Sequence, residues 1–101
     1  MNFIFHKREV LHRKIKREID GPISDLLETG WTVHSSIYSA KFFGNWQVIL
    51  RRGEDQVLLV KDRSQYAIDG DEHLMTPDFR KSFESLPEFE SAVWRLAHRT
   101  S

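Results

Sequence analysis

The sequence contains no cysteine, three prolines, five glycines and no long apolar run. Without cysteine the chain can form neither a disulfide framework nor a thiolate metal site, and nothing marks it as extracellular. The longest uninterrupted apolar run is Val57–Val60, far short of the roughly 20 residues that cross a bilayer. We therefore expect a bacterial or cytoplasmic protein without a secretory signal, a membrane-spanning segment or a membrane partner.

Net charge is also absent, because 15 Lys and Arg balance 15 Asp and Glu over 101 residues. Such a balance disfavours a dedicated nucleic-acid-binding protein, which usually has a clearly basic domain. The charges are nevertheless unevenly distributed: residues 1–52 carry nine basic and five acidic side chains, and residues 53–101 carry six and ten. A chain of this length can bury one core without metal or disulfide support. We expect a single domain over residues 1–101.

Residues 1–30 are expected to be helical. Apolar residues within 3–19 recur at helical spacing, and the opposite face is basic. The sequence Asp20-Gly21-Pro22 should break this helix, with Pro22 opening a second short helix that ends at Gly30.

Residues 31–69 are expected to form antiparallel strands. From Trp31 the apolar residues alternate with polar ones, as they do in half-buried strands. Short segments rich in Gly, Asn, Asp and Ser separate the predicted strands 31–38, 46–52, 56–61 and 65–68. Turns this short favour hairpins, so the strands should pair as a meander.

Residues 76–99 should again be helical. Thr76 and Pro77 have the chemistry of a helix start, followed by Phe79 and Phe83 at i, i+4. Ser85-Leu86-Pro87-Glu88 has the spacing of a capping box and predicts a last helix. The fold class is therefore α+β, with a three- to four-stranded antiparallel meander flanked by N-terminal and C-terminal helices.

Motifs for catalysis, metal binding and cofactor binding are missing. The five histidines are scattered without metal-ligand spacing, and no nucleophile elbow, dinucleotide fingerprint or P-loop is present. We expect no enzyme activity, no metal site and no cofactor. An enzyme would need residues that meet only in three dimensions, with His34, His73 and Asp62 as the candidates.

Two features suggest a surface for a protein partner. Asp69, Asp71 and Glu72 form an acidic segment that could steer a basic partner, and with Trp46 they form our predicted contact surface. The aromatic segment Phe42-Phe43-Gly44-Asn45-Trp46, which opens with a phenylalanine pair, either plugs the end of the fold or presents an anchor, and we expect it to plug. If the pair were exposed instead, it would favour a homodimer.

The basic face of the first helix offers an alternative partner. Clustered cations displace counterions from a polyanion, so this face could contact nucleic-acid phosphates. Its residues are Lys7, Arg13, Lys14, Lys16 and Arg17. A solvated amphipathic face explains the same pattern and is the simpler interpretation.

The middle of the chain resembles small bacterial proteins, some of which are immunity proteins of toxin systems. The resemblance covers residues 43–66 and consists of Phe43-Gly44-Asn45-Trp46, the apolar strands that follow and Asp62-Arg63-Ser64-Gln65-Tyr66. It implies a non-enzymatic protein that binds and blocks a cognate toxin or enzyme. Our leading hypothesis is therefore a small inhibitor that acts by stoichiometric protein binding, with nucleic-acid binding as the alternative.

Overall fold

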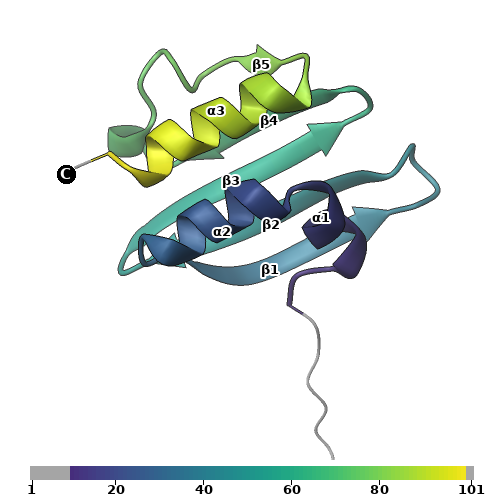
Figure 1. Ribbon diagram of the computed structural model, residues 1–101, viewed down its shortest axis with the longest axis horizontal. Helices are drawn as coiled ribbons and strands as arrows, with labels where there is room; N and C mark the ends of the chain where they lie inside the picture. Colours follow the sequence, from purple (N-terminus) through teal and green to yellow (C-terminus); the bar gives the residue numbers. More distant parts are fainter. Residues whose placement is uncertain (1–9, 100–101) are drawn as a thin grey trace, which may run out of the picture.

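The computed structural model describes residues 10–99, which form three α-helices, a short 3₁₀ helix and one five-stranded sheet (Figure 1). The sheet is antiparallel throughout, with the strands in sequence order. The elements are α1 (Arg13–Glu18), α2 (Asp20–Glu28), β1 (Thr32–Ser39), β2 (Asn45–Arg52), β3 (Asp55–Asp62), β4 (Gln65–Gly70), η1 (Glu72–Leu74), β5 (Ser82–Phe83) and α3 (Leu86–Ala97). This is the predicted α+β meander with flanking helices, and β5 is an additional strand.

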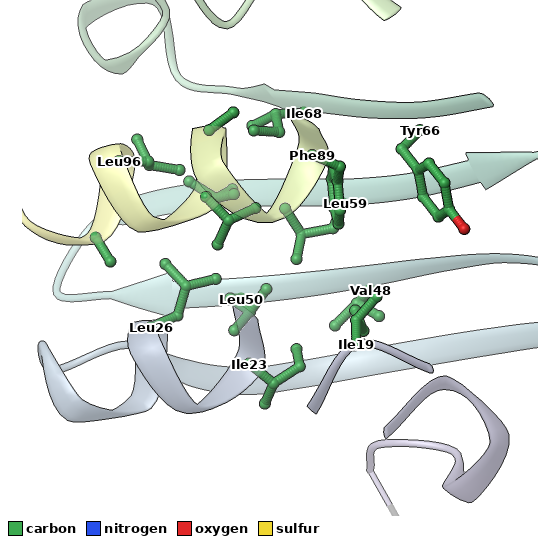
Figure 2. Close-up of a cluster of buried hydrophobic side chains, with 14 of the residues drawn as sticks. Ile19, Ile23, Leu26, Val48, Leu50, Leu59, Tyr66, Ile68, Phe89 and Leu96 are labelled. Atoms are coloured by element: carbon green, nitrogen blue, oxygen red, sulfur yellow. The ribbon is translucent and has the colours of Figure 1, made fainter. Parts of the chain in front are cut away.

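The helices cover one face of the sheet, with α2 in front of β1 and β2 and α3 on the side of β4 (Figure 1). Along β2, Trp46, Val48 and Leu50 are buried and their neighbours are not, so these three side chains point toward the helices. Figure 2 shows the core between the two layers, where side chains of α2 and α3 meet those of the central strands. The other face of the sheet has no described element over it (Figure 1).

The first helix differs from its prediction at both ends. Of the predicted range 3–19, residues 3–9 lie outside the described part of the chain, and the helix begins only at Arg13. His12 is the N-cap residue of α1, because its Nδ1 accepts a hydrogen bond from the Lys14 amide at 3.1 Å. The break predicted at Asp20-Gly21-Pro22 falls instead at Ile19, and Pro22 lies in the first turn of α2, where its missing N–H costs nothing.

The helix predicted from Thr76 and Pro77 is wrong. The amides of Phe79 and Arg80 bond to carbonyls three residues earlier, which makes isolated turns. The chain then extends, and Phe83 pairs with Tyr66 as part of β5. Phe79 and Phe83 are both buried, so the spacing that resembled a helix face arises from a loop and a strand that contact the same core.

The last helix is as predicted. The Ser85 hydroxyl accepts a hydrogen bond from the Glu88 amide at 3.3 Å, which caps α3 at its N-terminus. Phe89, Val93 and Leu96 are buried on the face that meets the sheet.

Candidate interaction surface

Trp46 does not lie on the surface, so this part of the predicted contact surface is wrong. Its side chain is 3% exposed, and its indole Nε1 donates to Glu18 Oε1 at 3.1 Å. The physical reason is the two-residue repeat of a strand. Trp46, Val48 and Leu50 are two residues apart on β2, so all three side chains face the core. A partner cannot reach this indole without opening the core.

The acidic residues of the predicted surface lie at the opposite end of the sheet from Trp46. Trp46 pairs with Lys61 near the end of β3, whereas Asp69 pairs with Leu58 and lies near the end of β4 that leads toward η1. Asp71 Oδ2 accepts a hydrogen bond from the Gln56 amide at 2.9 Å, and Glu72 pairs with Arg80 at 2.9 Å. The structure therefore does not bring the predicted tryptophan and carboxylates together.

The basic side chains of α1 are exposed. Arg13, Lys14, Lys16 and Arg17 all point to solvent, and Lys7 lies outside the described residues. Lys16 pairs with Asp20 at 3.1 Å, and Lys14 Nζ lies 5.5 Å from the ring centroid of Tyr38. This leaves Arg13 and Arg17 as part of a solvated cationic face.

Glu18 fixes α1 to three strands. Its Oε2 accepts from the Tyr66 hydroxyl at 2.8 Å and lies 3.0 Å from Lys61 Nζ, while Oε1 accepts from Trp46. Burial raises the pKa of Glu18, but the hydrogen bonds from Lys61, Tyr66 and Trp46 outweigh it and hold the pKa below the usual 4.5. Burial and the same carboxylate raise the pKa of Tyr66 to about 12. A general acid or base near neutral pH needs pKa shifts in the opposite direction. The contacts of Glu18 with β2, β3 and β4 anchor α1 to the sheet.

The catalytic candidates do not meet. His73 Nε2 lies 3.1 Å from Asp55 Oδ1 at the start of β3, whereas Asp62 ends the same strand. His34 is exposed on β1.

Within residues 10–99 no group of three or more His, Asp or Glu side chains is arranged to hold a metal ion. None of the helices in this part of the chain has the length and apolar character needed to cross a membrane.

Phe42 and Phe43 are exposed, so the prediction that the aromatic segment 42–46 plugs the end of the fold is wrong for these two residues and holds for Trp46. Phe42 is 64% and Phe43 70% exposed. That end of the core is instead filled by Trp46, Tyr66 and Phe89, whose ring centroids lie 5.0 to 6.4 Å apart. These three rings occupy the place that the loop phenylalanines were expected to take.

The loop that carries these phenylalanines has a defined backbone. The Phe42 amide donates to the Ser39 carbonyl and the Asn45 amide to the Phe42 carbonyl, both at 3.0 Å. Phe43 has a φ of 61°, a left-handed conformation that non-glycine residues rarely adopt. Such backbone strain persists where the surrounding structure imposes it and is often found at functional positions.

Hydrogen bonds to the neighbouring β3–β4 turn hold the phenylalanine loop in place. Asn45 Oδ1 accepts from the Arg63 amide at 2.6 Å, and Asn45 Nδ2 donates to Asp62 Oδ1 at 3.3 Å. Arg63 also has a left-handed backbone, with φ of 62°. Its guanidinium carbon lies 5.4 Å from the ring centroid of Phe43. Two loops that are distant in sequence thus form one surface.

A shallow hollow of about 360 Å³ adjoins these loops on the uncovered face of the sheet. Its apolar walls include Ile37, which is 57% exposed, and Val60. We call the combination of Phe42, Phe43, Arg63 and Ile37 the end surface. The phenylalanine pair was visible in the sequence, whereas no sequence signal linked Arg63 or Ile37 to it.

Comparison with protein-family models, with curated proteins and with solved structures found no match. The resemblance of residues 43–66 to immunity-type proteins therefore rests on the sequence pattern.

Proposed function

We propose that this chain is a protein-binding module whose end surface contacts a protein partner and inhibits it by stoichiometric occlusion. The observation that carries the proposal is the pair of adjacent phenylalanines, each more than half exposed, on a loop with a defined backbone. Water contact with two such rings is unfavourable, and burying them against a partner recovers that free energy. Aromatic and arginine side chains are also the residue types that most often dominate binding energy at interfaces.

The two loops are held together before any partner binds, and this preorganisation favours tight binding. Asn45 joins the phenylalanine loop to the Arg63 turn in the free protein. Binding then loses less conformational entropy than it would if both loops had to become ordered at the interface.

The charges near the end surface favour an acidic partner. Lys41 and Arg63 are exposed beside the phenylalanines. The basic α1 approaches the same end through Tyr38, which stacks on His12 at 4.8 Å and lies beside Gly44. Complementary charge would steer a partner with a negative surface to this end.

The proposed inhibitor class agrees with the sequence resemblance. The segment 43–66 contains Phe43 and Arg63 of the end surface and Asn45, which joins their two loops. An immunity protein needs no catalytic group of its own, because it acts by covering the active site or substrate surface of its toxin.

The proposal is tested by capturing partners from the native lysate after nuclease treatment. The double variant Phe42→Ala/Phe43→Ala should recover at least about tenfold less of a stoichiometric partner than the unmodified protein, as expected for two hot-spot residues. The variants Leu27→Ala and Trp94→Ala remove exposed apolar side chains from α2 and α3 and should leave recovery unchanged. Equal recovery with the double variant would exclude the end surface as the contact.

Nucleic-acid binding is the second candidate, because the exposed cations of α1 and the exposed phenylalanines lie toward the same end. Proteins that bind single strands combine such cations with aromatic side chains on which bases stack. In this case the affinity for an oligonucleotide should fall steeply with salt. The triple variant Arg13→Gln/Lys14→Gln/Arg17→Gln should then abolish binding, and nuclease should release all captured material.

A further inference from the structure

The sheet has a free edge at β5. This strand pairs with β4 through Tyr66–Phe83 and Ala67–Ser82, and no described strand lies on its other side. In the part of the chain that the structure describes, residues 81–84 form no backbone–backbone hydrogen bond with any element other than β4. The outward-pointing backbone groups of such an edge can pair with an added strand. Strand addition is one of the recurring ways in which a protein binds an extended peptide.

The other edge of the sheet, β1, is less suited to an added strand. The residues before α1 lie against it, because Ser36 Oγ donates to the Val10 carbonyl at 2.6 Å and accepts from the His12 amide at 2.9 Å. A register shift between Val33 and Ser35 also interrupts the pairing of β1. Neither obstacle occurs along β5.

A hollow of about 360 Å³ lies beside the β5 edge. Phe83 is buried under α3, where its ring centroid lies 6.3 Å from that of Phe89, and Lys81 Nζ lies 5.5 Å from the Phe83 ring centroid. Both strand residues therefore face the helix-covered side of the sheet. α3 contributes the other wall through Pro87, Glu88, Ser91 and Arg95. A strand added to β5 would point alternate side chains into this hollow.

The charged groups of the hollow are separated along its length. After β5 the chain reverses direction, and α3 runs back beside the strand (Figure 1). Lys81 precedes β5 and Arg95 lies in the last turn of α3, so both cations lie toward one end. Glu88 lies in the first turn of α3, about 10 Å from Arg95 along the helix axis. Neither cation forms an ion pair within residues 10–99.

Three further charged side chains near this edge do not line the hollow: Asp78, Arg80 and Glu84. Arg80 is paired with Glu72 at 2.9 Å. Glu84 directly follows Phe83, so its side chain points to the opposite face of the extended chain. Asp78 lies on the turn that precedes Lys81. Inside the hollow two cations therefore face one carboxylate, and the end with the two cations suits an added carboxylate.

We propose that β5 binds the C-terminal segment of a protein partner as an added antiparallel strand, with the free carboxylate of the segment at Lys81 and Arg95. Antiparallel pairing continues the order of the sheet and directs the C-terminal end of the segment toward Lys81. Residues 76–80 form turns, so the edge offers no further extended chain beyond Lys81 and the segment ends there. This site is separate from the end surface, and either interaction can fail without the other.

An NMR titration with a short peptide tests this site. The probe is acetyl-Thr-Val-Thr-Val with a free C-terminal carboxylate, and we expect it to shift the amide signals of Ser82, Phe83 and Ser91. Because β5 pairs over two residues, few main-chain bonds can form, and we expect a Kd of about 0.1–1 mM. The same peptide with a C-terminal amide should bind about tenfold more weakly, because it lacks the charge that the two cations attract.

A matched pair of variants assigns the carboxylate. Lys81→Gln/Arg95→Gln should weaken binding of the free acid by about tenfold, to the level of the amide. Arg13→Gln/Arg17→Gln removes two exposed cations from α1 and should leave the Kd unchanged. Circular dichroism of each variant establishes that it is folded before it is titrated.

N-methylation of the peptide distinguishes strand addition from charge attraction. Successive N–H groups of an added strand point alternately toward β5 and away from it. Methylating the amide nitrogen of the last valine, or that of the threonine before it, should therefore weaken binding by about tenfold at one position and leave it unchanged at the other.

Four results would overturn the proposal. They are no signal change at millimolar peptide, shifts confined to elements other than β5 and α3, equal binding of the acid and the amide, and equal effects of the two N-methylations. The third result would exclude the carboxylate at Lys81 and Arg95, and the fourth would exclude pairing with the strand edge.

Discussion

At the residue scale, Glu18 joins segments that are far apart in the sequence. Its carboxylate connects α1 to β2, β3 and β4 through Trp46, Lys61 and Tyr66. The donors around this partly buried carboxylate favour its ionised form, which explains the direction of its pKa. Removing the charge leaves the donors around it without an acceptor of equal strength.

Glu18→Gln should lower the free energy of unfolding at neutral pH by roughly 1–3 kcal/mol, the usual cost of breaking a buried charged hydrogen-bond group. Because folding lowers the pKa of Glu18, its stabilising effect is present above its usual pKa of 4.5 and is lost as the pH falls through the lower folded value. Urea unfolding between neutral and acidic pH should therefore show a shallower acid loss in the variant. Asp20→Asn, which removes an exposed pair with Lys16, is the control. An unchanged pH dependence in Glu18→Gln would contradict this role.

At the element scale, the proposed function depends on a connection between the β1–β2 loop and the β3–β4 turn. The β1–β2 loop carries the phenylalanines, and the β3–β4 turn carries Arg63. The Asn45 side chain forms hydrogen bonds with the Asp62 carboxylate and the Arg63 amide at this turn. Neither loop contributes to the main core, so its order depends on such local bonds.

Asn45→Ala should weaken partner binding by about tenfold while lowering the free energy of unfolding by only about 1 kcal/mol, the usual net value of a hydrogen bond. The loss of affinity follows from the entropy of ordering two loops that were previously joined. Amide hydrogen exchange should become faster at Arg63 and remain unchanged in α3. Ser39→Ala, on the rim of the same hollow, is the matched control. Full affinity in Asn45→Ala would exclude preorganisation through this side chain.

The elements themselves were largely predictable from the sequence, because strand alternation and the Ser85 cap are local signals. The burial of Trp46 was also predictable from the sequence. Trp46 precedes Val48 and Leu50 by two and four residues, so all three side chains lie on the same face of β2. The Phe79–Phe83 spacing was misleading because residues of a loop and a strand can contact one core at helical spacing. The end surface required the structure, since Phe43 and Arg63 meet only after four strands have paired.

At the scale of the whole molecule, the basic and acidic side chains that are unevenly distributed along the sequence also lie at different ends of the structure. The cations of α1, Lys41 and Arg63 lie toward the end that exposes the phenylalanines, and the acidic residues 69–72 lie at the opposite end of the sheet. A neutral protein with this polarity can orient an approaching charged partner without the solubility and repulsion effects of a large net charge. We therefore expect the partner association rate, more than the lifetime of the complex, to decrease as salt increases.

We propose above all that the end surface contacts a protein. It is tested most directly by placing a photoreactive phenylalanine analogue at position 43 and irradiating the chain in its native lysate. We expect one cross-linked protein that survives nuclease treatment and is absent when the analogue replaces Trp94 on α3. The same cross-links from both positions, cross-links to nucleic acid alone, or none from position 43 would contradict it.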